Sequence, residues 1–129
     1  MRTFSLILLI VFTTLTLAAC ASNNENAPVQ AVENYLNALV EKDADRLTTL
    51  TCGDWEDDAL LAMDSFQAVT TRLEGVACEQ TDTDGNTALV LCKGNIVATY
   101  NEEDQQIDLS TSTYQVVQEG GEWLVCGTR

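Results

Sequence analysis

Acidic residues gather at one point of this 129-residue chain, where Asp54, Glu56, Asp57 and Asp58 occupy four of five consecutive positions. Neighbouring carboxylates act as acid and base only where their surroundings push their pKa values apart. They also offer oxygens to calcium, although this run lacks the central glycine and the final glutamate of a calcium loop. Since acidic residues favour the first turn of a helix, a solvated helix start is the simpler interpretation. The chain has no histidine, which excludes Ser–His and Cys–His pairs.

Cys20 is the cysteine with the most specific surroundings. Arg2 precedes the apolar run LILLIVFTTLTL at 6–17, which has the length expected for the core of a secretory signal peptide. The sequence Leu17-Ala18-Ala19-Cys20 follows and resembles the lipobox of bacterial lipoproteins. That resemblance implies a diacylglyceryl group on the Cys20 sulfur, removal of residues 1–19 and acylation of the new amino terminus.

A lipidated Cys20 would anchor the protein to a membrane on the extracytoplasmic side of the cell envelope. The alternatives are an uncleaved membrane helix, for which about 20 apolar residues are needed, and an ordinary cleaved signal that leaves a free thiol. Residues 20–27 lack an apolar period and are interpreted as a lipidated tether. Its seven residues after Cys20 reach at most about 24 Å. Residues 28–129 then form a single domain of ordinary size for a small fold.

Removing residues 1–19 takes away one of the six basic residues, Arg2, and leaves all 20 acidic ones, for a formal charge of −15. Such a surface repels nucleic acid and anionic lipid headgroups, so we expect no nucleic-acid partner. Solubility is the simplest reason for the charge. A cation or a basic partner is the alternative.

The domain keeps four cysteines: Cys52, Cys78, Cys92 and Cys126. An even number in a small exported domain indicates two disulfides, for which spacing alone allows three pairings. Zinc is the alternative, but the paired C-x-x-C spacing of zinc sites is missing. We expect no metal and no cofactor.

Helices are expected first along the domain and strands afterwards. Apolar residues recur at helical spacing over 28–41, a short helix follows from Asp43 to a stop at Gly53, and a third helix runs over 54–69. The period then changes to two. Strands are predicted at 72–82, 87–100, 105–118 and 121–127, with turns at 101–104 and 120–121. The expected fold class is α+β, with N-terminal helices packed on a four-stranded antiparallel meander.

The first predicted hairpin narrows the choice of disulfides. Asp84-Gly85-Asn86 is a strong turn signal between two strands. If these three residues form the loop, residue 83 faces 87 and Cys78 lies opposite Cys92. The remaining pair would be Cys52 with Cys126.

Two segments carry a resemblance to a known fold family. They are VENYLNALVEKDADRL at 32–47 and YQVVQEGGEWLVC at 114–126. Both are similar to the opening helices and the closing hairpin of the nuclear transport factor 2-like superfamily, a cystatin-like cone fold that includes ketosteroid isomerase and polyketide cyclases. The resemblance implies a cone-shaped α+β domain over nearly all of residues 28–129.

Within that family, ketosteroid isomerases suggest an active site. Tyr35 corresponds to the tyrosine that donates a hydrogen bond to the developing oxyanion. The catalytic base corresponds to Ala59, beside Asp57 and Asp58, so the local pattern differs from that of the enzymes. Tyr35 and Asp58 are the candidate catalytic residues, and a core tyrosine is the alternative interpretation of Tyr35.

Three functions remain open from the sequence. The preferred hypothesis is a non-catalytic envelope module that binds a small ligand or another envelope protein. The second is a small isomerase or cyclase that uses Tyr35 with an acidic residue. The third is a structural lipoprotein that acts as a homodimer. Fold alone favours none of them, because one fold hosts many functions.

Overall fold

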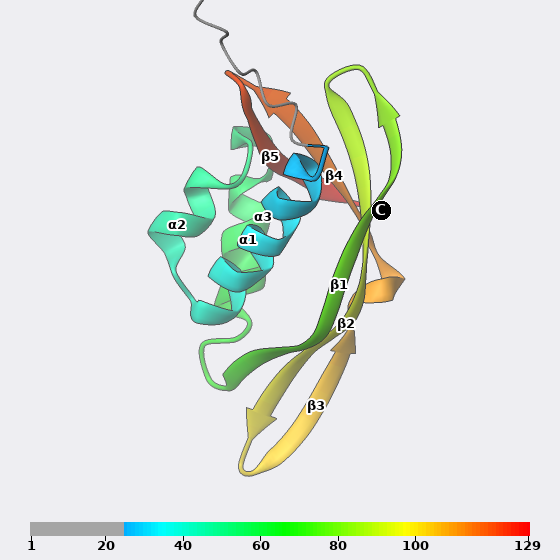
Figure 1. Ribbon diagram of the computed structural model, residues 1–129. Coiled ribbons are helices and arrows are strands. Elements are labelled where there is room, and N and C mark those ends of the chain that lie inside the picture. The colour runs from blue at the N-terminus through cyan, green and yellow to red at the C-terminus, as the bar shows by residue number, and fades with distance from the viewer. Residues whose placement is uncertain (1–24) are drawn as a thin grey trace, which may run out of the picture.

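A computed structural model describes residues 25–129, in which three helices pack against one side of a curved antiparallel sheet (Figure 1). This arrangement confirms the expected α+β class. The predicted signal peptide, Cys20 and most of the predicted tether lie outside the described residues. Within residues 25–129, no helix has the length and hydropathy needed to cross a membrane.

The first two helices follow the sequence pattern closely. Helix α1, Ala27–Glu41, has Pro28 in its first turn, where a missing N–H donor does no harm. It ends at Lys42, which takes the left-handed conformation of a helix cap at φ 57°. Helix α2, Ala44–Thr49, begins after Asp43, whose side chain accepts a hydrogen bond from the Arg46 backbone N–H.

Helix α3, Gly53–Asp64, differs from the expectation at both ends. Gly53 begins this helix and does not end α2, because Thr51 bridges to Val125 of the last strand and Cys52 is extended beside it. There the Cys52 N–H donates to the Val125 carbonyl, and the Val125 N–H donates to the Leu50 carbonyl. At its other end α3 stops at Asp64, and turns occupy residues 65–68 where the helix was expected to continue to 69. Apolar spacing does not reveal either boundary.

The sheet runs in the order β1-β2-β4-β5, with β3 beside the second half of β2. Its strands are β1 Thr70–Asp84, β2 Thr87–Tyr100, β3 Glu103–Asp108, β4 Thr113–Glu119 and β5 Glu122–Thr128. The single strand predicted at 105–118 is therefore wrong, because a short 3-10 turn, Leu109–Thr111, divides it. The Asp108 side chain accepts hydrogen bonds from the Ser110 backbone and hydroxyl, and Leu109 turns into the core.

The β1–β2 hairpin has a two-residue loop at 85–86, where three residues were expected, since Asp84 pairs with Thr87. One extra residue in β1, Thr81, shifts the register between Gln80 and Asp82. This bulge restores the expected pairing, so Cys78 still lies opposite Cys92. Cys78 and Cys92 are therefore opposite each other as predicted, but for a different reason. The loop is one residue shorter than expected, and the bulge at Thr81, which the sequence pattern does not reveal, compensates for it.

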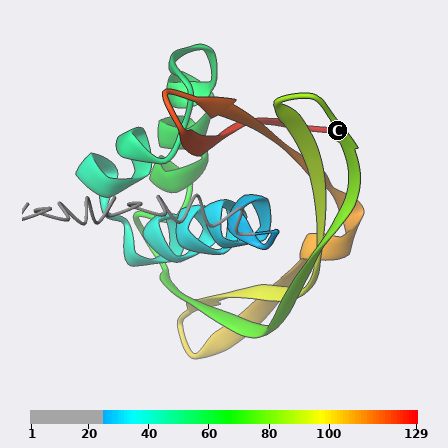
Figure 2. The same ribbon diagram turned by 45° about the horizontal axis from the view of Figure 1, so that its top comes forward.

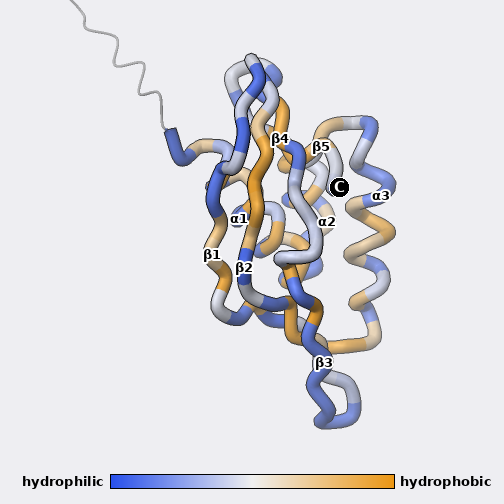
Figure 3. The backbone as a smooth tube through the Cα atoms, turned by 90° about the vertical axis from the view of Figure 1, so that its right-hand side faces the viewer, coloured by the Kyte–Doolittle hydropathy of each residue, from blue (hydrophilic) through white to orange (hydrophobic). Residues whose placement is uncertain are grey.

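Side chains of the helices fill the concave side of the sheet. The largest fully buried side chains come from both layers: Val32, Leu36 and Leu47 from the helices, and Val90, Cys92, Val97, Val116 and Val125 from the sheet. Figure 3 views the sheet from its outer side, where the mainly hydrophobic β2 runs past the hydrophilic β3. The interior of the cone is therefore the hydrophobic core of the domain.

Gly94 faces a second bulge of β1, at residues 75–76, where the sheet bends. It has a φ of 101°, and a Cβ built on it would lie 2.6 Å from the backbone oxygens of Glu74 and Gly75. We expect Gly94→Ala to lower the free energy of unfolding by about 2 kcal/mol or more, since an unfavourable positive φ alone costs about 1–2 kcal/mol. Chemical denaturation measures this change.

Gly53→Ala is the matched control for this prediction. Gly53 lies at the start of α3, and a Cβ there meets nothing within 4 Å. Alanine suits a helix better than glycine by roughly 0.5–1 kcal/mol. The control should leave stability unchanged or raise it slightly. A Gly94→Ala variant as stable as the natural protein would show that the bend does not require glycine.

Candidate functional site

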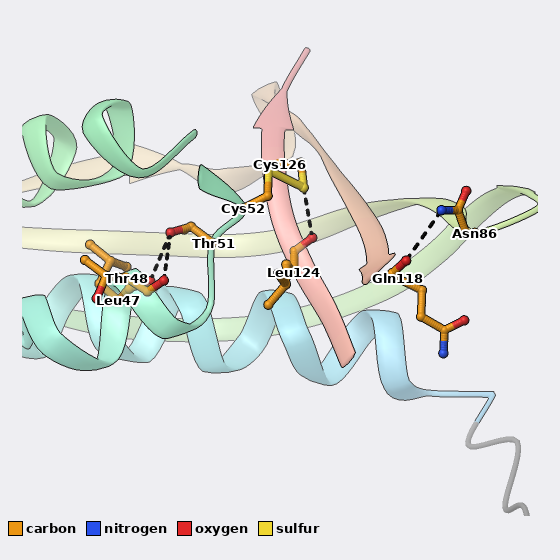
Figure 4. The surroundings of a disulfide bond; sticks show 8 residues. All are labelled: Leu47, Thr48, Thr51, Cys52, Asn86, Gln118, Leu124 and Cys126. Atoms are coloured by element: carbon orange, nitrogen blue, oxygen red, sulfur yellow. Dashed lines mark hydrogen bonds between the residues drawn. A yellow bond between two sulfur atoms is a disulfide. The ribbon is translucent and has the colours of Figure 1, made fainter. Parts of the chain in front are cut away.

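The four cysteines of the domain lie in the two pairs that the hairpin register favoured. Cys78 is bonded to Cys92 across β1 and β2. Cys52, at the start of α3, is bonded to Cys126 in β5 (Figure 4). Thr51, beside this second bond, donates through its hydroxyl to the Leu47 carbonyl. The second disulfide therefore ties the end of the helical layer to the last strand.

Tyr35, the candidate oxyanion donor, is a buried core residue. Only 4% of its surface is exposed, and its ring meets that of Tyr114 edge-on at a centroid distance of 6.1 Å. Burial raises the pKa of Tyr35, neighbouring Trp55 lowers it, and Asp58 raises it through charge. The Trp55 Nε1 atom is itself buried without hydrogen-bond geometry to any group of the described chain. Asp58 thus acts on Tyr35 through its charge, with a smaller effect than burial.

The carboxylates around the expected base position remain outside the core. Ala59, which occupies that position, is 1% exposed, whereas Asp57 and Asp58 are both exposed on α3. Thr51 is the one buried polar or charged residue found in the described part of the chain, so the Tyr35 hydroxyl faces no buried carboxylate there. Among residues 25–129, no group of three or more acidic or cysteine side chains is placed to hold a metal ion.

Burial of two tyrosines makes stability depend on pH. Burial, and to a smaller extent Tyr35, raises the pKa of Tyr114 to about 12, and the pKa of Tyr35 is raised as well. In the unfolded chain a tyrosine titrates near pH 10. Since ionisation then favours the unfolded state first, the free energy of unfolding should be constant up to about pH 10 and fall as the pH rises towards 12. Urea denaturation between pH 9 and 11 measures this.

Tyr114→Phe provides the check on that pH dependence. The variant removes the hydroxyl and should flatten the decrease above pH 10, because one of the two buried titrating groups is gone. If the free energy of unfolding of the variant fell as steeply above pH 10 as that of the natural protein, groups other than Tyr114 would cause the fall.

A hollow of the described surface lies at the mouth of the cone, where α1 begins. We call it the mouth groove; Figure 2 turns this end towards the viewer. Its volume is about 820 Å³, within the range of small-ligand sites. It is lined by Glu25, Ala27, Pro28, Gln80, Thr81, Asp82, Thr83, Gly85, Gln118, Gly121 and Trp123.

One wall of the mouth groove consists of four consecutive residues of β1, from Gln80 to Thr83. In a regular strand, consecutive side chains alternate between faces. The extra residue at Thr81 breaks that alternation, so neighbouring side chains border the same hollow. Gln80 also donates to the Thr83 hydroxyl, which links two residues of this wall.

The hairpin that carries this wall is tied to β4. The Gln118 N–H donates to the Asn86 carbonyl at 2.7 Å, and the Asn86 side chain donates back to the Gln118 carbonyl at 3.4 Å (Figure 4). These bonds fix the loop at 85–86 against the end of β4. This side of the groove is therefore held in place by hydrogen bonds within the domain.

Trp123 forms the opposite side of the mouth groove. It is half-buried, packs against the core and pairs with Gln118 across β4 and β5. It also borders a second hollow of about 470 Å³, which extends between α1 and the end of α2 and includes Glu122. Trp123 is not among the candidate site residues that the sequence indicates. The polar run at 79–84 beside a hairpin was the available signal for a groove.

Comparison with known proteins identifies the fold. No protein-family model matches the chain, and no curated protein matches it significantly. A candidate dehydratase of the NTF2-like family from Streptomyces avermitilis superposes with a TM-score of 0.58 at 16% identity, covering 80% of this chain and 91% of the other. A candidate ketosteroid isomerase from Shewanella frigidimarina gives 0.57 at 13% identity, covering 79% and 92%.

An NTF2-like protein from Cytophaga hutchinsonii gives a TM-score of 0.55 at 18% identity, covering 80% of this chain and 93% of the other. Identities at this level show the fold alone, and the chemistry of these proteins does not transfer with it. The domain therefore has the nuclear transport factor 2-like cone fold.

Proposed function

We propose that the protein is a non-catalytic binding module of the cell envelope, anchored by lipid on Cys20, that takes its ligand in the mouth groove. The observation that carries this proposal is the groove itself, in which a half-buried tryptophan faces a wall of amide, hydroxyl and carboxylate side chains. Small-ligand sites combine an apolar surface with a few placed polar groups in this way. The ligand is a small molecule or a segment of another envelope protein.

The filled interior supports a site at the mouth over one inside the cone. Val32, Leu36 and Val116 are fully buried beneath the sheet, and they leave the concave face occupied by the protein's own side chains. A ligand that entered there would have to displace them. The groove at the mouth requires no such displacement.

An isomerase-like or cyclase-like enzyme is the second candidate. The influence of Asp58 on the Tyr35 pKa favours it, since the two candidate catalytic residues lie close enough to interact. Against this candidate, Tyr35 is buried whereas Asp58 is exposed, so one substrate could not contact both side chains. If Tyr35→Phe abolished an isomerase or cyclase activity of the natural protein, this candidate would replace the binding module.

Dimerisation through the outer face of the sheet is the third candidate. Leu89, Leu91, Val117 and Leu124 are half-buried and alternate with core residues along their strands. Sedimentation of the chain at increasing concentration tests this candidate, and a stable dimer would support it.

Native mass spectrometry tests the binding proposal directly. The natural protein, extracted gently from the envelope, should carry an additional small mass, and Trp123→Ala should lose it. Because Trp123 also packs against the core, Thr83→Trp is needed as a second variant. Thr83 is exposed, so a tryptophan there fills the groove without altering the core. Tyr100→Ala, which removes an exposed aromatic side chain outside the groove, should keep the added mass.

Retention of the adduct by both groove variants would place the ligand elsewhere. A natural protein without any adduct, and without a bound partner after mild cross-linking in the envelope, would contradict the binding module.

A further inference from the structure

The mouth groove has carboxylates in its lining and no basic side chain. Glu25 and Asp82 border the groove itself, and Glu122 borders the adjoining hollow next to Trp123. No lysine or arginine borders either hollow. Several basic side chains of the described chain are engaged elsewhere, such as Arg46 with Glu41 and Arg72 with Glu74 and Asp104. The field in the groove is therefore negative.

A like-charge pair next to Trp123 adds to this field. Glu119 and Glu122 are direct cross-strand partners in β4 and β5, one step from the pair formed by Gln118 and Trp123. Like charges directly opposite on neighbouring strands destabilise a sheet. Within residues 25–129 neither glutamate takes part in an ion pair. A cation held near this turn would relieve part of the repulsion, although successive pairs along the strands face opposite sides of the sheet.

The start of α1 opposes the negative field only in part. A helix N-terminus carries about half a positive charge. Glu25 and Asp82 supply two full negative charges to the same groove. Pro28 also removes one backbone donor from the first turn, which weakens its use as an anion site. The balance therefore favours a cation over an anion.

Trp123 supplies the remaining element of cation recognition. The face of a tryptophan attracts an ammonium group within about 6 Å of the ring centroid, more strongly than the other aromatic residues do. Core contacts hold Trp123 in place beside the groove. We infer that the mouth groove binds a small organic cation, with an ammonium group between Trp123 and the carboxylates. This inference rests on the proposed function, because it names the ligand class of the same groove.

Choline and 3,3-dimethyl-1-butanol are suitable probes, because they share one shape and differ in charge. Each is titrated into the full chain, produced through an oxidising compartment and held in a non-ionic detergent. The two tryptophans give two indole N–H signals in NMR, and Trp123→Phe assigns them. We expect choline to shift the Trp123 signal and to bind at least about tenfold more tightly than the alcohol, as for a desolvated cation–aromatic contact.

Paired variants test the role of the carboxylates. Glu25→Gln combined with Glu122→Gln removes two charges from the lining and should weaken choline binding about fivefold or more, since exposed ion pairs contribute modestly. Glu102→Gln combined with Glu103→Gln removes the same net charge at the β2–β3 turn, outside both hollows, and should leave choline binding nearly unchanged.

The outcomes separate this inference from the proposed function. Equal binding of choline and the alcohol would overturn the inference, as would equal weakening by the two paired variants, while leaving a groove that binds ligands. A Trp123 signal that responds to neither probe would also overturn it. If the native adduct were absent as well, the proposed function would fail together with the inference.

Discussion

A chain in which a cleavable secretory leader replaces residues 1–20 is expected to leave the membrane fraction completely, whereas the natural chain stays in it. The reason is the lipid that the lipobox resemblance places on Cys20. Each buried methylene contributes about 0.8 kcal/mol, so one acyl chain binds reversibly while two or three hold a protein firmly. Detergent-phase partitioning measures the difference, because the lipidated protein enters the detergent phase and the variant remains in water.

Intact-mass measurement sharpens this prediction. The natural protein should have the mass of residues 20–129 plus its acyl groups, less four hydrogens for two disulfides. Cys20→Ser should carry no acyl mass. A natural chain that retains residues 1–19 would instead indicate an uncleaved membrane helix, and an unmodified Cys20 would indicate an ordinary secreted protein. Either result would contradict the lipid anchor.

The anchor bears on the proposed binding site because of the short distance between them. Glu25, which lines the mouth groove, is the fifth residue after Cys20. Such a segment spans at most about 18 Å. A lipid on Cys20 would therefore hold the groove near the membrane surface, with the β2–β3 hairpin at the other end of the domain (Figure 1). The mouth groove would then bind its ligand close to the bilayer.

Periodicity predicted most of the fold because the helices and strands here obey simple burial rules. The apolar stripe of α1 and the alternation along β2 both survive in the structure. The departures come from long-range contacts. Gly53 begins α3 because residues 50–52 pair with β5, which lies 70 residues further along, and no local pattern encodes that pairing.

The site was predictable only in part, for a related reason. Tyr35 and Asp58 were singled out by resemblance, and the structure does bring them close, but it buries one and exposes the other. The mouth groove depends on the bulge at Thr81 and on the bonds between Asn86 and Gln118. A bulge changes which side chains share a face, and sequence alternation alone does not locate it.

Removing the two disulfides separately is expected to destabilise the domain by unequal amounts. The Cys52–Cys126 bond spans 74 residues of sequence and the Cys78–Cys92 bond spans 14. Closing the longer loop restricts the unfolded chain more, so the chain-entropy relation gives about 4.5 kcal/mol for the first bond and about 3 kcal/mol for the second. Small domains are stable by about 5–15 kcal/mol in total. Loss of the Cys52–Cys126 bond should therefore leave little stability.

Paired alanine substitutions make the comparison fair. Alanine avoids placing a hydroxyl at Cys92, which is fully buried. Urea denaturation of Cys52→Ala/Cys126→Ala and of Cys78→Ala/Cys92→Ala should show the larger loss for the first pair. The opposite order would mean that contacts around Cys92 in the core outweigh the entropy of the unfolded chain. Equal stability of the natural protein with and without reductant would mean that the bonds do not form, in which case core packing and the hydrogen bonds of residues 50–52 hold the helical layer to β5.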